Sequence, residues 1–141
     1  MSDEPVWRFM DRRDIADVSG ATDVYLRRWY LITTPFGGLM LHNIRRPDAD
    51  RALHDHPWSF ASLILRGGYI EERRADSGRP RRLHYHAGNL NLVRAESLHR
   101  IDSLSGSVWT LVAHGPRRRV WGFSPQPGQW IDWRRHLAVA S

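Results

Sequence analysis

The sequence predicts an all-β fold, a sandwich or barrel built from short strands. Short apolar runs recur along the chain and are separated by turn residues such as Gly67-Gly68 and Gly115-Pro116. Residues 108–113 follow the two-residue alternation of a strand, and both of its faces are largely apolar, which is typical of a strand buried on both sides. Helical periodicity is weak throughout, so helices are expected only near the ends.

The elements follow in order along the chain. Residues 11–18 are expected to form a short turn or helix that Gly20 ends, and residues 130–140 a strand followed by a helical tail. Gly67-Gly68 predicts a tight hairpin, and Leu104-Ser105-Gly106 is expected to separate two further strands. The predicted strands span residues 24–33, 38–45, 60–66, 69–74, 81–86, 90–94, 98–102, 107–114 and 119–123.

Length and composition exclude several classes of protein. A chain of 141 residues suits one domain, 1–141, that buries enough surface to fold without disulfides. The absence of cysteine excludes thiolate metal sites and cysteine nucleophiles. The absence of lysine excludes Schiff-base lysines and P-loops. No apolar run is long enough to span a bilayer and the N-terminus is charged, so we expect a cytoplasmic protein without a membrane partner.

The net charge of +6 comes entirely from arginine. The arginines are scattered as doublets, many of them beside acids, as in Asp11-Arg12-Arg13-Asp14. No known nucleic-acid motif accompanies them. They are therefore interpreted as solvated side chains, and a nucleic-acid partner is not expected.

Two pairs of histidines have the spacing of residues on one face of a strand. His54 and His56 lie two residues apart, so both imidazoles can reach one metal ion from an extended segment. His84 and His86 have the same spacing and are expected on an exposed strand. The spacing alone is therefore a weak signal for metal.

The residues around His54 and His56 strengthen the signal. After His56 come three residues, Phe60, six residues and Gly67, and a second segment contains Gly88 and His99. This spacing resembles the two motifs of the cupin superfamily, and HDHPWSF and WTLVAHGPRRRVWGF are similar to small single-domain bacterial and phage cupins. The resemblance implies a cupin double-stranded β-helix, or jelly-roll barrel, with a core at about 24–123 and short extensions at both ends. Phe60 stands where the family usually has a glutamate ligand.

The resemblance implies a metal site of three histidines, His54, His56 and His99. Neutral imidazoles suit a divalent transition metal, with Fe(II) expected first and Zn(II) or another ion second. Three protein ligands leave positions open for a substrate. A metal-free pocket and purely structural histidines remain as alternatives.

Other side chains are candidates for the pocket wall. His42, Phe60, Ser62 and Trp109 are expected to contact substrate, and His42 is the candidate for a catalytic base or a fourth ligand, or else is a buried histidine bonded to the backbone. Asp55 is expected to face away from the ligands as a loop partner. The remaining expectation is that Arg66 and Tyr69 lie far from Phe60 and have no catalytic role.

This interpretation of the histidine motifs favours a metal-dependent cupin enzyme that acts on a small molecule. Because neutral ligands leave the ion's charge uncompensated, the substrate is expected to be anionic. The resemblance implies a three-histidine Fe(II) dioxygenase or a lyase or isomerase. The alternatives are a non-catalytic small-molecule-binding cupin, or a metal-free sugar epimerase that pairs His42 with Tyr30 or Tyr85. A homodimer is expected, since the seven tryptophans give more apolar surface than one barrel needs.

Overall fold

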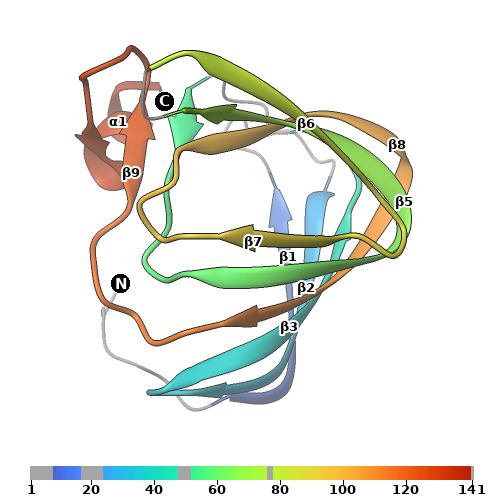
Figure 1. Cartoon of the computed structure of the whole chain (residues 1–141). Helices are drawn as coiled ribbons and strands as arrows, with labels where there is room; N and C mark the ends of the chain where they lie inside the picture. Colours follow the sequence, from blue (N-terminus) through green and yellow to red (C-terminus); the bar gives the residue numbers. More distant parts are fainter. Residues whose placement is uncertain (1–7, 17–23, 48–51, 76–77, 141) are drawn as a thin grey trace.

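The computed structural model describes residues 8–16, 24–47, 52–75 and 78–140. Almost all of its regular structure is antiparallel strand, with one helix close to the C-terminus (Figure 1), which confirms the predicted all-β class. The elements are β1 (Arg8–Ala16), β2 (Val24–Thr34), β3 (Gly37–Ile44), β4 (Leu53–His54), β5 (Phe60–Arg74), β6 (Pro80–His86), β7 (Leu90–Val93), β8 (His99–His114), β9 (Gly122–Ser124), β10 (Ile131–Asp132) and α1 (Trp133–Ala140).

Two long, bent strands, β5 and β8, hold the two layers of the barrel together. The first half of β5 pairs with β7 and with the end of β8, whereas its second half pairs with β6 and with the start of β8. On the other side β8 pairs with β3, which continues through β2 to β1, and with β4, which continues to β9 and β10. The strands wrap around a common interior (Figure 1), as in a jelly-roll barrel.

The predicted hairpin at Gly67-Gly68 is wrong. Strand β5 continues through both glycines, and its register with β8 shifts between Ile64 and Arg66 and again between Arg66 and Gly68. Gly67 has a φ of 76°, and a Cβ there would lie 2.7 Å from the carbonyl oxygen of Ser107. The glycines therefore bend the strand between the two layers, where a side chain would not fit, and do not reverse it.

Two further boundaries differ from the prediction. Strand β8 runs without a break through Leu104-Ser105-Gly106, which was expected to be a turn. Residues 11–16, expected in a turn or helix, belong to β1, because they pair with β2; residues 17, 18 and 20 lie outside the described residues. The predicted C-terminal strand and helical tail are confirmed as β10 and α1.

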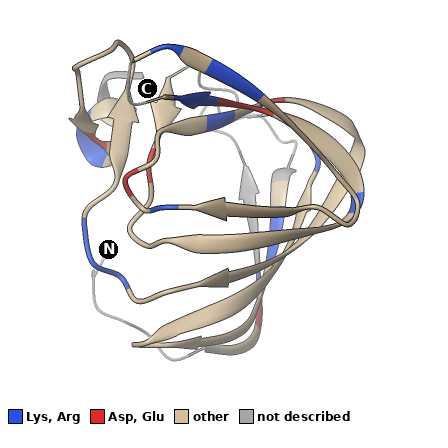
Figure 2. Cartoon of the chain, viewed as in Figure 1, with Lys and Arg blue, Asp and Glu red and all other residues tan. Residues whose placement is uncertain are grey.

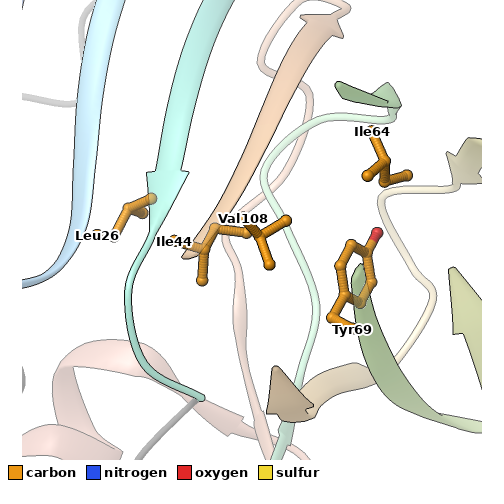
Figure 3. Packing of buried hydrophobic residues seen from close by; sticks show 5 residues of the cluster. All are labelled: Leu26, Ile44, Ile64, Tyr69 and Val108. Atoms are coloured by element: carbon orange, nitrogen blue, oxygen red, sulfur yellow. The ribbon is translucent and has the colours of Figure 1, made fainter. Parts of the chain in front are cut away.

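A hydrophobic cluster fills one part of the barrel interior. Figure 3 shows its buried members, which come from four strands: Leu26, Ile44, Ile64, Tyr69 and Val108. Leu26, Ile44 and Tyr69 also border the internal cavity described below. The hydrophobic cluster therefore forms one side of that cavity, and its close packing keeps the cavity-lining side chains in place.

Within the described part of the chain, α1 is the one helix, and its eight residues are too few to cross a lipid bilayer.

Candidate metal centre

The structure brings the three predicted histidines together inside the barrel. His54 on β4 and His99 at the start of β8 are direct register partners, and His56 follows two residues after His54. One ring nitrogen from each of the three lies within 4.8 Å of the others. Strand pairing therefore assembles a cluster from segments that are far apart in the sequence.

The donor set fits a transition-metal ion. Nε2 of His56 lies 3.5 Å from Nε2 of His99, close to the roughly 3.3 Å that separates two nitrogen ligands of one tetrahedral ion. Burial, followed by unfavourable electrostatic interaction with His99 and His54, lowers the pKa of His56 well below its ordinary value. The imidazole is therefore neutral at pH 7 and keeps the lone pair that a ligand needs.

Glu71 fixes the orientation of His99. Its Oε1 lies 2.5 Å from Nδ1 of the ring, and both residues are buried. In the neutral tautomer whose Nδ1–H donates to this carboxylate, the lone pair is on the opposite nitrogen, Nε2, which faces His56. A carboxylate behind a histidine is the arrangement that sets the tautomer of metal-ligating imidazoles.

Glu71 is itself held by a buried polar network. Its carboxylate accepts hydrogen bonds from Arg73 at 2.6 Å and from the Asn91 amide at 3.2 Å, and the same amide donates to the Tyr69 hydroxyl at 3.0 Å. Burial alone would raise the pKa of Glu71, but the bonds from His99 and Arg73 lower it below its ordinary value. The carboxylate is therefore charged and strengthens His99 as an electron-pair donor.

The segment between the histidines is anchored by Asp55, which faces away from them as predicted. Its carboxylate accepts hydrogen bonds from the Gly122 backbone at 2.7 Å and the Trp130 indole at 2.9 Å, and it pairs with Arg119 at 2.6 Å. Asp55 is 2% exposed. It ties the histidine segment to β9 and to the turn before β10.

A cavity of about 140 Å³ opens beside the three histidines. His42, Phe60 and Ser62 lie along it, where the sequence predicted them. The Phe60 ring is centred 4.9 Å from that of His56 and 6.2 Å from that of His99. The other lining residues come from five strands and from the segment that follows β4: Leu26, Arg28, Ile44, Trp58, Tyr69, Glu71, Asn91, Ile101, Thr110 and Val112.

Two expectations about the cavity wall are wrong. Trp109 does not line it; the ring stacks on Trp29 with centroids 5.5 Å apart, and Thr110 and Val112 occupy the inner face of β8. Both faces of this strand are apolar, so the alternation could not distinguish inside from outside. Tyr69 was expected far from Phe60 but lines the same cavity, because the bend at Gly67 turns β5 back over the interior.

The remaining histidines and tyrosines lie in distinct surroundings. His84 and His86 are exposed on β6, as predicted. Nε2 of His42 accepts a hydrogen bond from Arg28 at 2.9 Å, so its lone pair is already engaged. Tyr85 packs on Tyr69 with ring centroids 5.4 Å apart and is absent from the described cavity lining. Of the residues that the epimerase alternative pairs, the described cavity lining includes His42 but neither Tyr30 nor Tyr85.

Comparison with known proteins gives matches in structure only. No family model matches the chain, and no curated protein sequence matches it. Similar solved structures include the hydroxypropylphosphonic acid epoxidase of S. wedmorenis, HppE, with a TM-score of 0.52 and 16% identity over 64% of this chain and 50% of that one. KdgF from Halomonas sp. has a TM-score of 0.52 and 18% identity, covering 70% of this chain and 84% of that one.

A third similar structure is a variant of oxalate decarboxylase from Bacillus subtilis. Its TM-score is 0.56, with 13% identity over 75% of this chain and 29% of that one. The chain thus spans about half the length of the epoxidase and less than a third of the decarboxylase. At these identities the likeness is one of fold, and it agrees with the barrel that the strand pairing describes.

Proposed function

The chain has the cupin fold, and on this premise we propose that it is a metal-dependent enzyme acting on a small, anionic molecule. The observation that carries the proposal is the convergence of His54, His56 and His99 beside an internal cavity. A cluster with a purely structural role would not need an adjoining space, whereas a catalytic one needs room for a substrate.

We assign the three imidazoles as the ligands of one divalent ion, with Fe(II) first and Zn(II) second. One similar structure is described as FeII HppE, and another concerns the Mn(II) centres of oxalate decarboxylase, which supports a divalent metal here. Such an ion would act as a Lewis acid and offer open coordination positions to a substrate or to oxygen.

The surrounding residues have separable tasks in this proposal. Glu71 holds His99 in the tautomer that turns Nε2 inward. Phe60 and Val112 supply apolar wall, which excludes water from the reacting groups. The Ser62 hydroxyl offers a hydrogen bond to the substrate from the same wall. Together they support a three-histidine dioxygenase or a lyase or isomerase.

We further propose that the protein is a homodimer. The outer face of the sheet carries a continuous apolar row in direct strand register, and its ends, Phe9 and Leu92, are 77% and 66% exposed. Figure 2 shows few charged residues along β3, β7 and the second half of β8, which carry much of this face. A second copy related by twofold symmetry would present the same apolar row. The row consists of Phe9, Ile32, Leu39, Ala113, Ala61 and Leu92.

The decisive experiment for the function is elemental analysis of protein purified without a histidine tag. We expect about one iron or other divalent transition metal per chain. The metal-loaded protein is then incubated with small carboxylic acids, with oxygen uptake and product mass measured in parallel. Oxygen uptake identifies a dioxygenase, and a new product without uptake identifies a lyase or isomerase. A folded protein that takes up no transition metal would overturn the proposal.

A further inference from the structure

Arg28 lies on β2 with its side chain along the wall of the cavity that the three histidines border. Its Nε donates to Nε2 of His42 at 2.9 Å, and its Nη1 donates to the Tyr30 hydroxyl at 3.4 Å. A guanidinium has five N–H groups, so these bonds leave three for a ligand. The orientation of the side chain is thus fixed, and only part of its hydrogen-bonding capacity is engaged.

Three other partly buried arginines each pair with an acid. Arg73 pairs with Glu71 at 2.6 Å, Arg100 with Asp102 at 2.8 Å and Arg119 with Asp55 at 2.6 Å. Among the residues that the structure describes, no carboxylate pairs with Arg28. A cation set in a pocket wall with only neutral partners is positioned to receive an anion.

His42 holds this cation in place. It is the cross-strand partner of Arg28, on β3, and its ring accepts the Nε bond through an unprotonated nitrogen. Burial first, and then the charge of Arg28, lowers the pKa of His42 well below its ordinary value, so the ring remains a neutral acceptor at pH 7. A protonated His42 would donate at both nitrogens and repel the guanidinium.

Arg28 and the three histidines line the same cavity. The cation and the three imidazoles therefore act on one small space. That space has a volume of about 140 Å³, several times what one water molecule needs. It suits a short molecule with an anionic group at one end.

We infer that Arg28 is the anion-binding residue of the cavity, that His42 positions it, and that the ligand is a short carboxylic acid whose carboxylate pairs with the guanidinium. This inference rests on the proposed function for the role of the other end of the molecule, which faces the three histidines. The contact between Arg28 and the carboxylate is independent of any metal. His42 is then a positioning residue and not the base suggested by the sequence.

The test is calorimetric titration of malonate, with uncharged malonamide as its control, into chelator-treated and metal-loaded protein. Wild type is compared with Arg28→Gln and with Arg66→Gln, which removes the same charge from an exposed position on β5. We expect Arg28→Gln to weaken malonate binding at least about tenfold in both preparations, in the range of a lost charge-assisted pair. Arg66→Gln and malonamide separate this contact from the general field of the protein and from simple filling of the cavity.

A second pair of variants tests the role of His42. His42→Leu removes the acceptor for Nε and is expected to weaken malonate binding, whereas His42→Gln retains an acceptor and restores part of it. Metal content and melting temperature are measured for every variant to identify any that do not fold. Wild-type malonate affinity in a folded Arg28→Gln protein, or no malonate binding by wild type, would overturn the inference. Loss of metal binding with Arg28-dependent malonate binding intact would instead overturn only the proposed metal-dependent function.

Discussion

Oε1 of Glu71 and Nδ1 of His99 lie 2.5 Å apart across the neighbouring strands β5 and β8, both side chains being buried. The contact joins the polar network of one half of the barrel to the histidine cluster. The charged carboxylate of Glu71 sets the tautomer of the His99 imidazole. Removing this carboxylate should therefore change the metal affinity.

Glu71→Leu should weaken metal binding about 10- to 100-fold, as the loss of a carboxylate behind a ligand histidine does. Glu71→Gln keeps an oxygen that accepts from Nδ1 and should lose less. Affinities are measured by competition with a chromophoric chelator. Glu72→Gln is the matched control, since its side chain is 30% exposed and bonds to Arg100. Wild-type affinity in a folded Glu71→Leu protein would refute the positioning role.

Replacing any one of His54, His56 and His99 by alanine should reduce metal affinity roughly 100-fold or more while the barrel stays folded. Each removes one of three ligands, a larger loss than that of an outer-shell partner. Elemental analysis measures the loss of metal, and circular dichroism shows whether the barrel stays folded. His84→Ala, on the exposed strand β6, should retain the ion. Normal metal content in any two of the three ligand variants would show that the cluster is not the site.

Phe60→Glu should increase metal affinity by about tenfold or change the preferred ion. The Phe60 ring lies 4.9 Å from the His56 ring, so a carboxylate at this position adds an anionic donor near the cluster. Competition titrations with Fe(II), Mn(II) and Zn(II) measure the change, and Phe60→Leu controls for loss of the aromatic ring. Unchanged affinities for all three ions would mean that this side chain does not reach the metal.

Asp55→Ala should destabilise the fold by about 3 kcal/mol, the low end for breaking a buried ion pair, because Arg119 is 27% exposed. The change also leaves the Gly122 amide and Trp130 indole without their acceptor. Urea unfolding of the metal-free protein measures the loss. Asp55→Asn should lose less, since its amide oxygen still accepts one of these bonds. A change below about 1 kcal/mol in Asp55→Ala would show that the anchor contributes little.

Leu92→Glu should convert the proposed dimer to a monomer. It places a charge on an apolar side chain that is 66% exposed, at the end of the apolar row. Light scattering coupled to size-exclusion chromatography should give twice the chain mass of 16.4 kDa for wild type and the chain mass for the variant. Val120→Glu, outside the row, should remain dimeric. A wild-type mass of 16.4 kDa at micromolar concentration would contradict the proposal.

The short apolar runs of the sequence predicted an all-β fold, and its resemblance to cupin motifs implied the barrel and the histidine cluster. The positions of His54, His56 and His99 follow from short motifs, and strand pairing then brings these motifs together. The sequence could not predict Glu71 as the partner of His99. The position of Glu71 depends on whether the chain reverses or only bends at Gly67-Gly68, and the two glycines are compatible with both. Only the close approach of β8, where Ser107 would touch a Cβ at Gly67, favours the bend.

Other misses have similar physical causes. Trp109 was placed inside because β8 is apolar on both faces, so alternation gives no direction. Arg28 was one of many arginines in the sequence, and nothing in its neighbours along the chain marks it. Its importance comes from the cavity that it borders and from the lack of an acid paired with its guanidinium among the residues that the structure describes.

The pairing of β3 with β8 has a consequence for how the chain acquires its structure. Leu39 is matched with Ala113, and His54 with His99, so the sheet depends on contacts between segments that are distant along the chain. Proteins dominated by such contacts cross a large entropic barrier and fold in milliseconds to seconds. The histidine cluster requires β8 to pair with β4, so a nascent chain that has not yet synthesised residue 99 cannot retain an ion there through all three ligands.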